Sequence, residues 1–168
     1  RVGYVLQDNA LFPHLTVADN IRFGLRKLSR DERETRVADM LALLGLRGLE
    51  RRLPQDLSGG QQQRVAIARS LAPQPDLLLM DEPFSNLDAR LRTELVGELR
   101  GLLKTLGITT LLVTHDQDDA FGLADRLGYM NDGQVEQWDT PYDVYHRPRT
   151  RAVAKFIGDG VMLPAIGK

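Results

Sequence analysis

Two short apolar runs, and the long helical pattern between them, constrain the fold of this chain most. The runs are "DLLLM" at 76–80 and "ITTLLVTH" at 108–115. Asp88 can cap the intervening helix and Gly107 can end it. The apolar stripe of this helix consists of Leu91, Leu95, Leu99, Leu102 and Leu106. Strand, helix and strand in this order predict parallel strands of an α/β fold, and a wholly apolar run is typical of a strand buried on both faces.

The rest of the chain fits the same fold class. "RVGYVLQ" at 1–7 predicts a further strand. Residues 16–56 predict a helical block, with one helix from Thr16 to about Arg26 and a second from about Ser29 to Gly45. Other predicted elements are helices at 60–72, 116–125, 140–148 and 150–158 and a hairpin turn at Asn131-Asp132-Gly133.

Length and composition exclude several classes of protein. The 168 residues suffice for one domain with a core, or for one domain and a piece of another. A net charge of -1 provides no strong field for binding nucleic acid. The absence of cysteine excludes a disulfide scaffold and a cysteine-based metal site. No apolar run approaches the roughly 20 residues that a membrane-spanning helix needs.

The segment "LSGGQ" at 57–61 is a candidate anion site. Ser58 and Gln61 have the spacing of a capping box at a helix start. Gly59 and Gly60 leave the first free N–H groups of that helix uncovered, and the helix dipole favours an anion there. The alternative is an ordinary capped helix with a flexible entry. Because a glycine inside a helix costs about 1 kcal/mol, two in succession favour a use for the bare backbone.

Polar side chains follow three of the predicted strands. Asp81 and Glu82 come directly after 76–80, His115 ends the next strand, and Gln7 ends the first. Ligands of open α/β sheets bind at the carboxyl ends of the strands. A carboxylate there can hold Mg²⁺, and its neighbour can deprotonate a water that attacks a phosphate. The alternatives are a surface turn with two solvated acids and a structural histidine.

In their combined order these segments resemble the ATP-binding-cassette (ABC) ATPase family over nearly the whole chain. The resemblance implies a P-loop NTPase-like core, a mostly parallel sheet with flanking helices, into which a helical subdomain is inserted. The matching motifs are "LQD" (Q-loop), "LSGGQQQRVAIARSLA" (signature), "LLLMDEP" (Walker B strand), "SNLD" (D-loop) and "VTHDQDDA" (switch histidine). Asn86 in "SNLD" is a mild departure, since alanine is commoner there.

The resemblance implies a role for each motif residue in binding and hydrolysing ATP with Mg²⁺. Glu82 would be the catalytic base, and His115 would hold the γ-phosphate. Asp81 and Gln7 would serve Mg²⁺, and Gln7 would also link to the transport partner. The signature residues Ser58, Gly59, Gly60 and Gln61 would meet an ATP bound on a second, identical subunit. Asp88 would lie at the seam of that dimer.

One expected part of such a site has no match among these residues. A P-loop has the pattern G-x-x-x-x-G-K-[ST], with glycine directly before lysine. Lys27, Lys104 and Lys155 follow Arg, Leu and Ala, and Lys168 lies six residues after Met162 where the pattern needs glycine. The resemblance therefore implies that the P-loop and the aromatic residue that stacks on adenine belong to a missing N-terminal part. Their absence would uncover one side of the sheet.

Two segments resemble the importer subunits that energise uptake of sugars, sulfate, polyamines or ferric iron. They are "LQDNALFPHLTVADNIRFGL" and "VTHDQDDAFGLADRLGYMNDGQVEQWDTPYDVYHRP". The implied partners are a transmembrane permease, which would face the block from Phe12 to Leu28, and indirectly a substrate-binding protein outside the membrane. The implied location is the cytoplasmic face of a bacterial inner membrane, without a role for nucleic acid. A helical hairpin without a partner is the alternative for this block.

The resemblance also suggests domain bounds and a substrate. Residues 1–15 would form a core strand and the Q-loop, 16–56 the helical subdomain, and 57–156 the remaining ATPase core. Residues 157–168 would begin a regulatory β domain. In "FIGDGVMLPA", Asp159, Gly160, Leu163 and Pro164 fall on a ferric-type pattern, which favours iron, although a generic strand entry explains them almost as well. The alternatives are polyamine, sugar or sulfate import, a non-transport cassette that acts on DNA or ribosomes, and a non-catalytic regulatory cassette.

Overall fold

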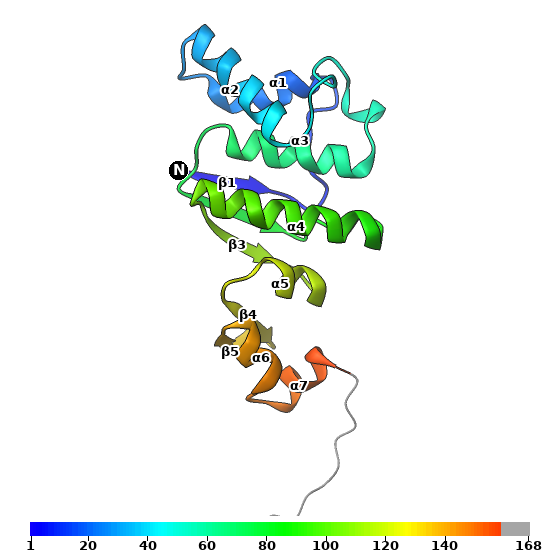
Figure 1. Cartoon of the computed structure of the whole chain (residues 1–168), viewed down its shortest axis with the longest axis vertical. Helices are drawn as coiled ribbons and strands as arrows, with labels where there is room; N and C mark the ends of the chain where they lie inside the picture. The colour runs from blue at the N-terminus through cyan, green and yellow to red at the C-terminus, as the bar shows by residue number, and fades with distance from the viewer. Residues whose placement is uncertain (159–168) are drawn as a thin grey trace, which may run out of the picture. The chain divides into compact units, whose positions relative to one another are not determined.

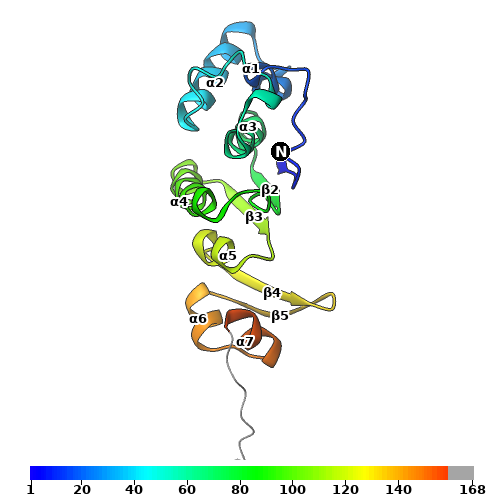
Figure 2. The same cartoon turned by 90° about the vertical axis from the view of Figure 1, so that its right-hand side faces the viewer.

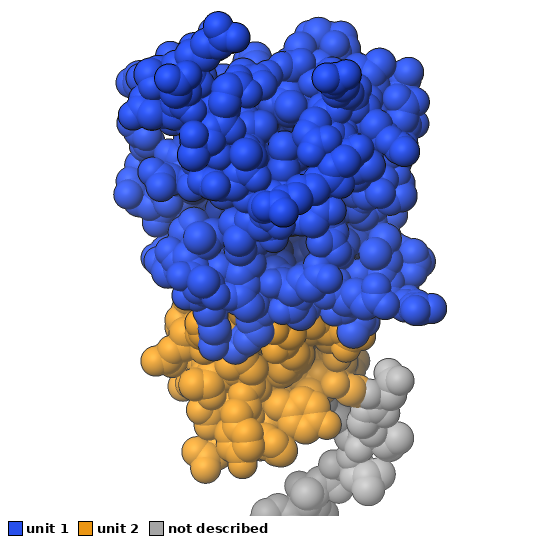
Figure 3. All heavy atoms as spheres, turned by 45° about the horizontal axis from the view of Figure 1, so that its top comes forward, with its two compact units in different colours: residues 1–115 blue, residues 116–168 orange. Residues whose placement is uncertain are grey.

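The computed structural model describes residues 1–158, and it divides the chain into two compact units. Residues 1–115 form the first unit, and the second begins at residue 116; Figure 3 shows the first in blue and the described residues of the second in orange. Figure 1 gives the order of the helices and strands along the chain. None of the helices in this described part is both long enough and apolar enough to span a membrane.

The first unit contains a parallel sheet of three strands in the order β1-β2-β3. The strands are β1 (Val2–Val5), β2 (Leu77–Asp81) and β3 (Thr109–Val113). Val5 pairs with Met80, and Asp81 pairs with Val113. The prediction of a parallel α/β sheet is therefore confirmed, and the carboxyl ends of all three strands lie along one edge.

Helices cover only one face of this sheet among the described residues. Figure 2 shows α3 (Gly59–Leu71) and α4 (Ala89–Leu106) on the same side of the strands. On that side Val5 and Leu78 are completely buried. On the other, Val113 is 54% exposed, and Leu79 is only half-buried. The prediction that β2 is buried on both faces is wrong, because no described segment covers its second face. The exposed face agrees with the other expectation, that one side of the sheet would be uncovered.

The helical block contains α1 (Val17–Arg22), η1 (Phe23–Leu25), α2 (Arg30–Leu43) and η2 (Pro54–Asp56). Thr16 caps α1 as predicted, but the α-helix ends at Arg22 and continues only as a 3₁₀ turn. The completely buried Asn20 holds the entry to α1, since its amide bonds main-chain atoms of Phe12, Leu15 and Thr16. Ser29 and Glu32 form a capping box at the start of α2.

Up to residue 158, the second unit consists of a two-stranded hairpin and three short helices. They are α5 (Gln117–Leu123), β4 (Leu127–Asn131), β5 (Gln134–Asp139), α6 (Pro141–His146) and α7 (Arg151–Ile157). Asp132 and Gly133 form the predicted turn, both with positive φ, and Leu127, Val144 and Val153 are buried together. Ile157 is the last residue of α7, and the rest of the predicted regulatory strand, from Asp159 on, lies outside the described residues.

Candidate functional site

The carboxyl edge of the sheet brings four of the sequence-predicted residues into one region. Asp81 is the last residue of β2 and Glu82 follows it. His115 comes two residues after β3, and Gln7 comes two residues after β1. Because the three strands are parallel and adjacent, their ends meet at this edge.

Glu82 and His115 are in direct contact. The Nδ1 atom of His115 lies 2.7 Å from the carboxylate of Glu82. At this distance a protonated Nδ1 donates a hydrogen bond to the carboxylate. The side chain of Glu82 is 19% exposed, whereas that of His115 is 75% exposed. The Glu82 side chain is therefore mostly buried, whereas the imidazole ring of His115 is mostly exposed to solvent.

The backbone at Glu82 is strained and firmly held. Its φ of 46° lies in the left-handed region, which costs a residue other than glycine on the order of 1 kcal/mol or more. Its N–H donates to the carbonyl of Val113 at 2.9 Å, and its carbonyl accepts from the N–H of Ser85 at 3.3 Å and the hydroxyl of Ser85 at 3.0 Å. These three hydrogen bonds hold the strained conformation and fix the origin of the Glu82 side chain.

Asp81 has the chemistry of a cation ligand. Its carboxylate makes no ion pair with residues 1–158 and receives only a long contact of 3.5 Å from the Tyr4 hydroxyl. The described residues contain no group of three or more His, Cys, Asp and Glu side chains able to hold a metal ion. Mg²⁺ commonly binds through one or two carboxylates, waters and substrate phosphates, so a single free carboxylate at a strand end fits this ion.

Gln7 is exposed, and its main chain is tied to the segment that follows Glu82. The side-chain amide of Asn86 donates to the Gln7 carbonyl at 3.1 Å, although the two residues are 79 apart in sequence. The structure therefore joins the Q-loop to the D-loop at the edge of the sheet.

Ser58 and Gln61 form the predicted capping box at the start of α3. The Ser58 hydroxyl accepts from the Gln61 N–H at 3.3 Å, and the Gln61 side chain accepts from the Ser58 N–H at 3.0 Å. The capping box uses the N–H groups of Ser58 and Gln61. The N–H groups of Gly59 and Gly60, which lie between them, receive no partner from the capping box.

The two glycines that follow Ser58 differ in their surroundings. A β-carbon at Gly60 would lie 2.7 Å from a methyl group of Leu91, so close packing against α4 accounts for this glycine. A β-carbon at Gly59 would make only an ordinary contact of 3.5 Å with Leu87, and Gly59 is exposed. Of the two glycines, Gly59 therefore has room beside it for a bound group. Through Leu87 and Leu91, the "LSGGQ" segment lies next to the D-loop and the start of α4.

Asp88 has a structural role at this place. Its carboxylate accepts from the N–H of Leu91 at 3.0 Å and so caps α4, as predicted. It remains exposed at the surface of the D-loop.

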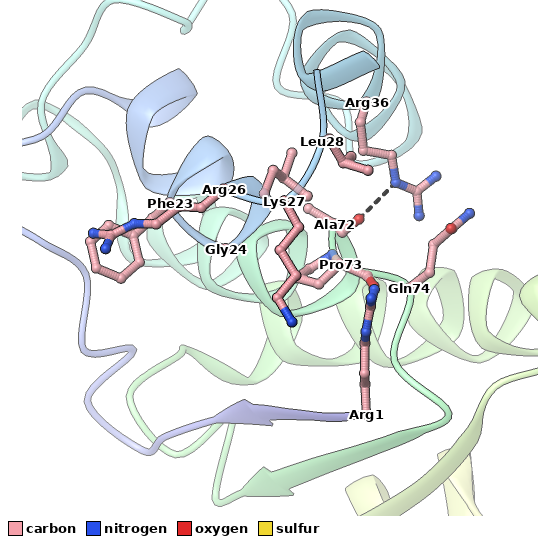
Figure 4. A pocket seen from close by; sticks show the side chains of 11 residues that line it. Arg1, Phe23, Gly24, Arg26, Lys27, Leu28, Arg36, Ala72, Pro73 and Gln74 are labelled. Atoms are coloured by element: carbon pink, nitrogen blue, oxygen red, sulfur yellow. Dashed lines mark hydrogen bonds between the residues drawn. The ribbon is translucent and has the colours of Figure 1, made fainter. Parts of the chain in front are cut away.

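A cavity of about 450 Å³ in the first unit lies away from the carboxyl edge. Figure 4 shows its lining, which includes Arg1 at the opposite end of β1 from Gln7. Two of its guanidinium groups already bond main-chain carbonyls: Arg36 donates to Ala72 at 2.8 Å and Arg1 donates to Pro73 at 3.2 Å. These hydrogen bonds satisfy two main-chain carbonyls just beyond the C-terminal end of α3. None of the sequence-predicted site residues lines the cavity.

Sequence reasoning missed two residues that contact the Q-loop. Asn86 carried a signal, because it departs from the family pattern. Arg69 carried only a weak one, as a charged residue within the run "VAIARSL" that forms the more apolar second half of α3. Phe12, the first residue of the block expected to face a permease, is half-buried: its ring lies 4.3 Å from that of Phe23, and Phe23 is the exposed member at 42%.

Comparison with known proteins is consistent with this geometry. Residues 1–85 match the family model described as ABC transporter. The chain is 53% identical over 164 residues to the sulfate/thiosulfate import ATP-binding protein CysA 2 of Chromobacterium violaceum, covering 97% of this chain and 45% of that protein. It is 54% identical over 160 residues to the Fe(3+) ions import ATP-binding protein FbpC of Streptomyces coelicolor, covering 94% of this chain and 46% of that protein.

Among solved structures, cbiO1 of Clostridium perfringens, part of the ABC transporter complex cbiONQ, has the same fold. The TM-score is 0.81 at 35% sequence identity, and the match covers 87% of this chain and 59% of that one. The chain thus spans about half the length of the relatives that it matches. Its sheet, its helices and the family match agree, and the chain belongs to the ABC transporter family.

Proposed function

We propose that the complete protein containing this chain is the ATP-binding and ATP-hydrolysing subunit of an importer. The observation that carries this proposal is the contact between Glu82 and His115 at the carboxyl edge of the sheet, beside the free carboxylate of Asp81. The relatives are named as import ATP-binding proteins, which supports the same role.

In this role Glu82 is the base that takes a proton from the attacking water. Its enclosed carboxylate and its firmly held backbone place the base with little freedom, which favours proton transfer at a defined position. His115 reaches outward from the same edge, where an N–H donor can hold the γ-phosphate of ATP. The pair is thus suited to phosphoryl transfer to water.

Asp81 and Gln7 are the residues that would hold Mg²⁺. A carboxylate and an amide oxygen are the oxygen donors that this ion prefers. When bound with ATP, Mg²⁺ neutralises charge on the phosphates. The chain's own contribution is to hold both donors at neighbouring strand ends.

The signature segment serves a second copy of the subunit in this proposal. The start of α3 offers the N–H groups of Gly59 and Gly60, which the capping box of Ser58 and Gln61 leaves free, and the positive end of a helix dipole to the γ-phosphate of an ATP held by the partner. Gly60 allows α3 to approach Leu91 closely, and Asp88 lies at the seam between the two copies. The functional form would be a homodimer.

The remaining partners follow from the importer role. A permease would contact the helical block, where Phe23 presents an exposed ring beside Phe12. The subunit would be peripheral on the cytoplasmic face of the inner membrane, and a substrate-binding protein would act through the permease. The proposed domains are 1–15, 16–56 and 57–156, with a regulatory β domain from 157. Ferric iron is the proposed substrate, with polyamine, sugar or sulfate as the alternatives.

The test uses the complete protein with its permease. Glu82→Gln should lower ATP hydrolysis by about 10²-fold, because the amide cannot accept the proton. In ATP and Mg²⁺ this variant should persist as a dimer, measured by size-exclusion chromatography with light scattering. A Glu82→Gln variant that stays monomeric where the wild type dimerises would contradict the proposed role.

A second substitution separates the dimer contact from the base. Ser58→Arg in the Glu82→Gln background should abolish the dimer, because the long side chain fills the space for the partner's γ-phosphate. Ser29→Arg is the matched control, since Ser29 caps α2 in the same kind of capping box. The Ser29→Arg variant should still dimerise. If it does not, damage to any helix cap prevents dimerisation, and the effect of Ser58→Arg is not specific to the signature segment.

A further inference from the structure

The turn that follows Gln7 has an unfavourable backbone. Asn9 and Ala10 have φ of 61° and 42°, in the left-handed region that residues other than glycine rarely adopt. Asn9 is also buried, and its Oδ1 atom has no hydrogen-bond partner among residues 1–158. Both features cost free energy, so contacts from outside the turn must hold this conformation.

Arg69 of α3 provides contacts of this kind. Its Nη1 donates to the Ala10 carbonyl at 2.6 Å, and its Nη2 donates to the Asn9 carbonyl at 2.9 Å. The guanidinium also lies over the Phe12 ring, 5.4 Å from its centroid. Burial lowers the pKa of Arg69, and the negative charge of Asp8 offsets this effect only in part. A planar fork that binds two successive carbonyls is specific to arginine, and lysine cannot reproduce it.

The helix that carries Arg69 is itself fixed to β1. The hydroxyl of Ser70 donates to the Tyr4 carbonyl at 2.7 Å. A β-carbon at Gly3 would lie 2.8 Å from the Ser70 carbonyl, so the helix and the strand are in close contact there. Arg69 therefore connects the turn after Gln7 to helix α3, which is itself packed against β1.

Asn86 contacts the other end of the turn, at the Gln7 carbonyl. The side chain of Gln7 is exposed and makes no hydrogen bond with any described residue. Its placement consequently depends on its main chain alone, and that main chain is held at Gln7 by Asn86 and two and three residues later by Arg69.

We propose that Arg69 and Asn86 are positioning residues that fix Gln7 at the nucleotide site by holding the main chain of its turn. This inference rests on the proposed role of Gln7. It assigns to two side chains, one in the signature helix and one in the D-loop, a role that acts only through a third residue.

The test is a double-mutant cycle in the complete protein with its permease. Arg69→Lys should lower the kcat of ATP hydrolysis by about tenfold, within the roughly 10²-fold that a misplacement of 1 Å can cost. In a Gln7→Ala background the same substitution should change kcat by less than about twofold, because the residue that it positions is gone. Asn86→Ala, at an exposed site, should behave in the same way with a smaller effect.

A measurement independent of activity accompanies the cycle. Without nucleotide, Arg69→Lys should raise amide hydrogen exchange at Asn9 and Ala10, whose N–H groups bond Leu6 and Asp8 within the turn, and should leave exchange in β2 unchanged. Arg64→Lys is the matched control: Arg64 lies on the same helix and contacts Leu44 and Glu98 instead. It should alter neither kcat nor exchange in the turn.

The outcomes separate the two proposals. An effect of Arg69→Lys or Asn86→Ala that is as large with Gln7→Ala as without it would overturn the positioning role and leave the ATPase assignment intact. A wild-type protein without ATP hydrolysis, or one insensitive to Gln7→Ala, would overturn the assignment of Gln7 and the positioning role together. Should Arg69→Lys fail to fold, the cycle with Asn86→Ala decides by the same criterion.

Discussion

The imidazole of His115 and the carboxylate of Glu82 lie 2.7 Å apart, although 33 residues separate them in sequence. The pairing of Asp81 with Val113 accounts for this contact, because it places the residues that follow β2 and β3 side by side. The main-chain bond from Glu82 to Val113 then turns the carboxylate toward the neighbouring strand end. The contact is a product of strand register and of a strained backbone together.

We expect His115→Ala to lower ATP hydrolysis by the complete protein about 10²-fold, the loss that follows removal of one donor to developing charge. ATP affinity, measured with a fluorescent analogue, should change little, since one donor is lost from many phosphate contacts. His146→Ala is the control, because His146 lies in α6 and its ring contacts that of Tyr142, with 4.3 Å between the ring centroids. Unchanged turnover in His115→Ala would remove His115 from the site.

Gly59 and Gly60 should respond differently to alanine. Gly60→Ala places a β-carbon 2.7 Å from Leu91, and overpacking of this kind costs about 1–3 kcal/mol. The melting temperature should fall, and Leu91→Ala should restore part of the loss. Gly59→Ala should leave the melting temperature nearly unchanged, and should weaken the ATP-dependent dimer of Glu82→Gln. Equal thermal destabilisation by both substitutions would contradict this division.

Local rules in the sequence were sufficient for much of this fold. Thr16, Ser29, Ser58 and Asp88 each start a helix as predicted, because a cap depends on atoms within three residues. The parallel strands followed from two apolar runs joined by a helix. The uncovered face of β2 was not expected from its composition, since an apolar run alone does not tell which of its faces other segments cover.

The candidate site shows where such rules end. That Glu82, His115 and Gln7 would share one edge could be predicted from parallel strands. The left-handed backbone of Glu82 and the contacts from Arg69 and Asn86 to the turn after Gln7 could not. These contacts join residues about 60 to 80 positions apart, and they depend on how α3 and the D-loop pack on the strand ends.

The 168-residue chain by itself should hydrolyse ATP no faster than a blank without protein. None of its lysines lies in the P-loop pattern, whose main-chain N–H groups and lysine cradle the phosphates. Phosphate release from ATP and Mg²⁺ measures this. Turnover well above the blank that Glu82→Gln abolishes would show that these residues suffice for catalysis, and turnover that survives Glu82→Gln would indicate a contaminating enzyme.

The last prediction is that the complete transporter imports ferric iron. The nucleotide site does not determine this, because relatives named for sulfate and for Fe(3+) are about equally similar to the chain. The basis is "FIGDGVMLPA", where Asp159, Gly160, Leu163 and Pro164 lie beyond the described residues. The transporter should be reconstituted with its own permease and binding protein. Fe³⁺-loaded binding protein should stimulate ATP hydrolysis and uptake, whereas spermidine, maltose and sulfate should not. Stimulation by one of these three and none by Fe³⁺ would reject iron as the substrate and leave the importer role in place.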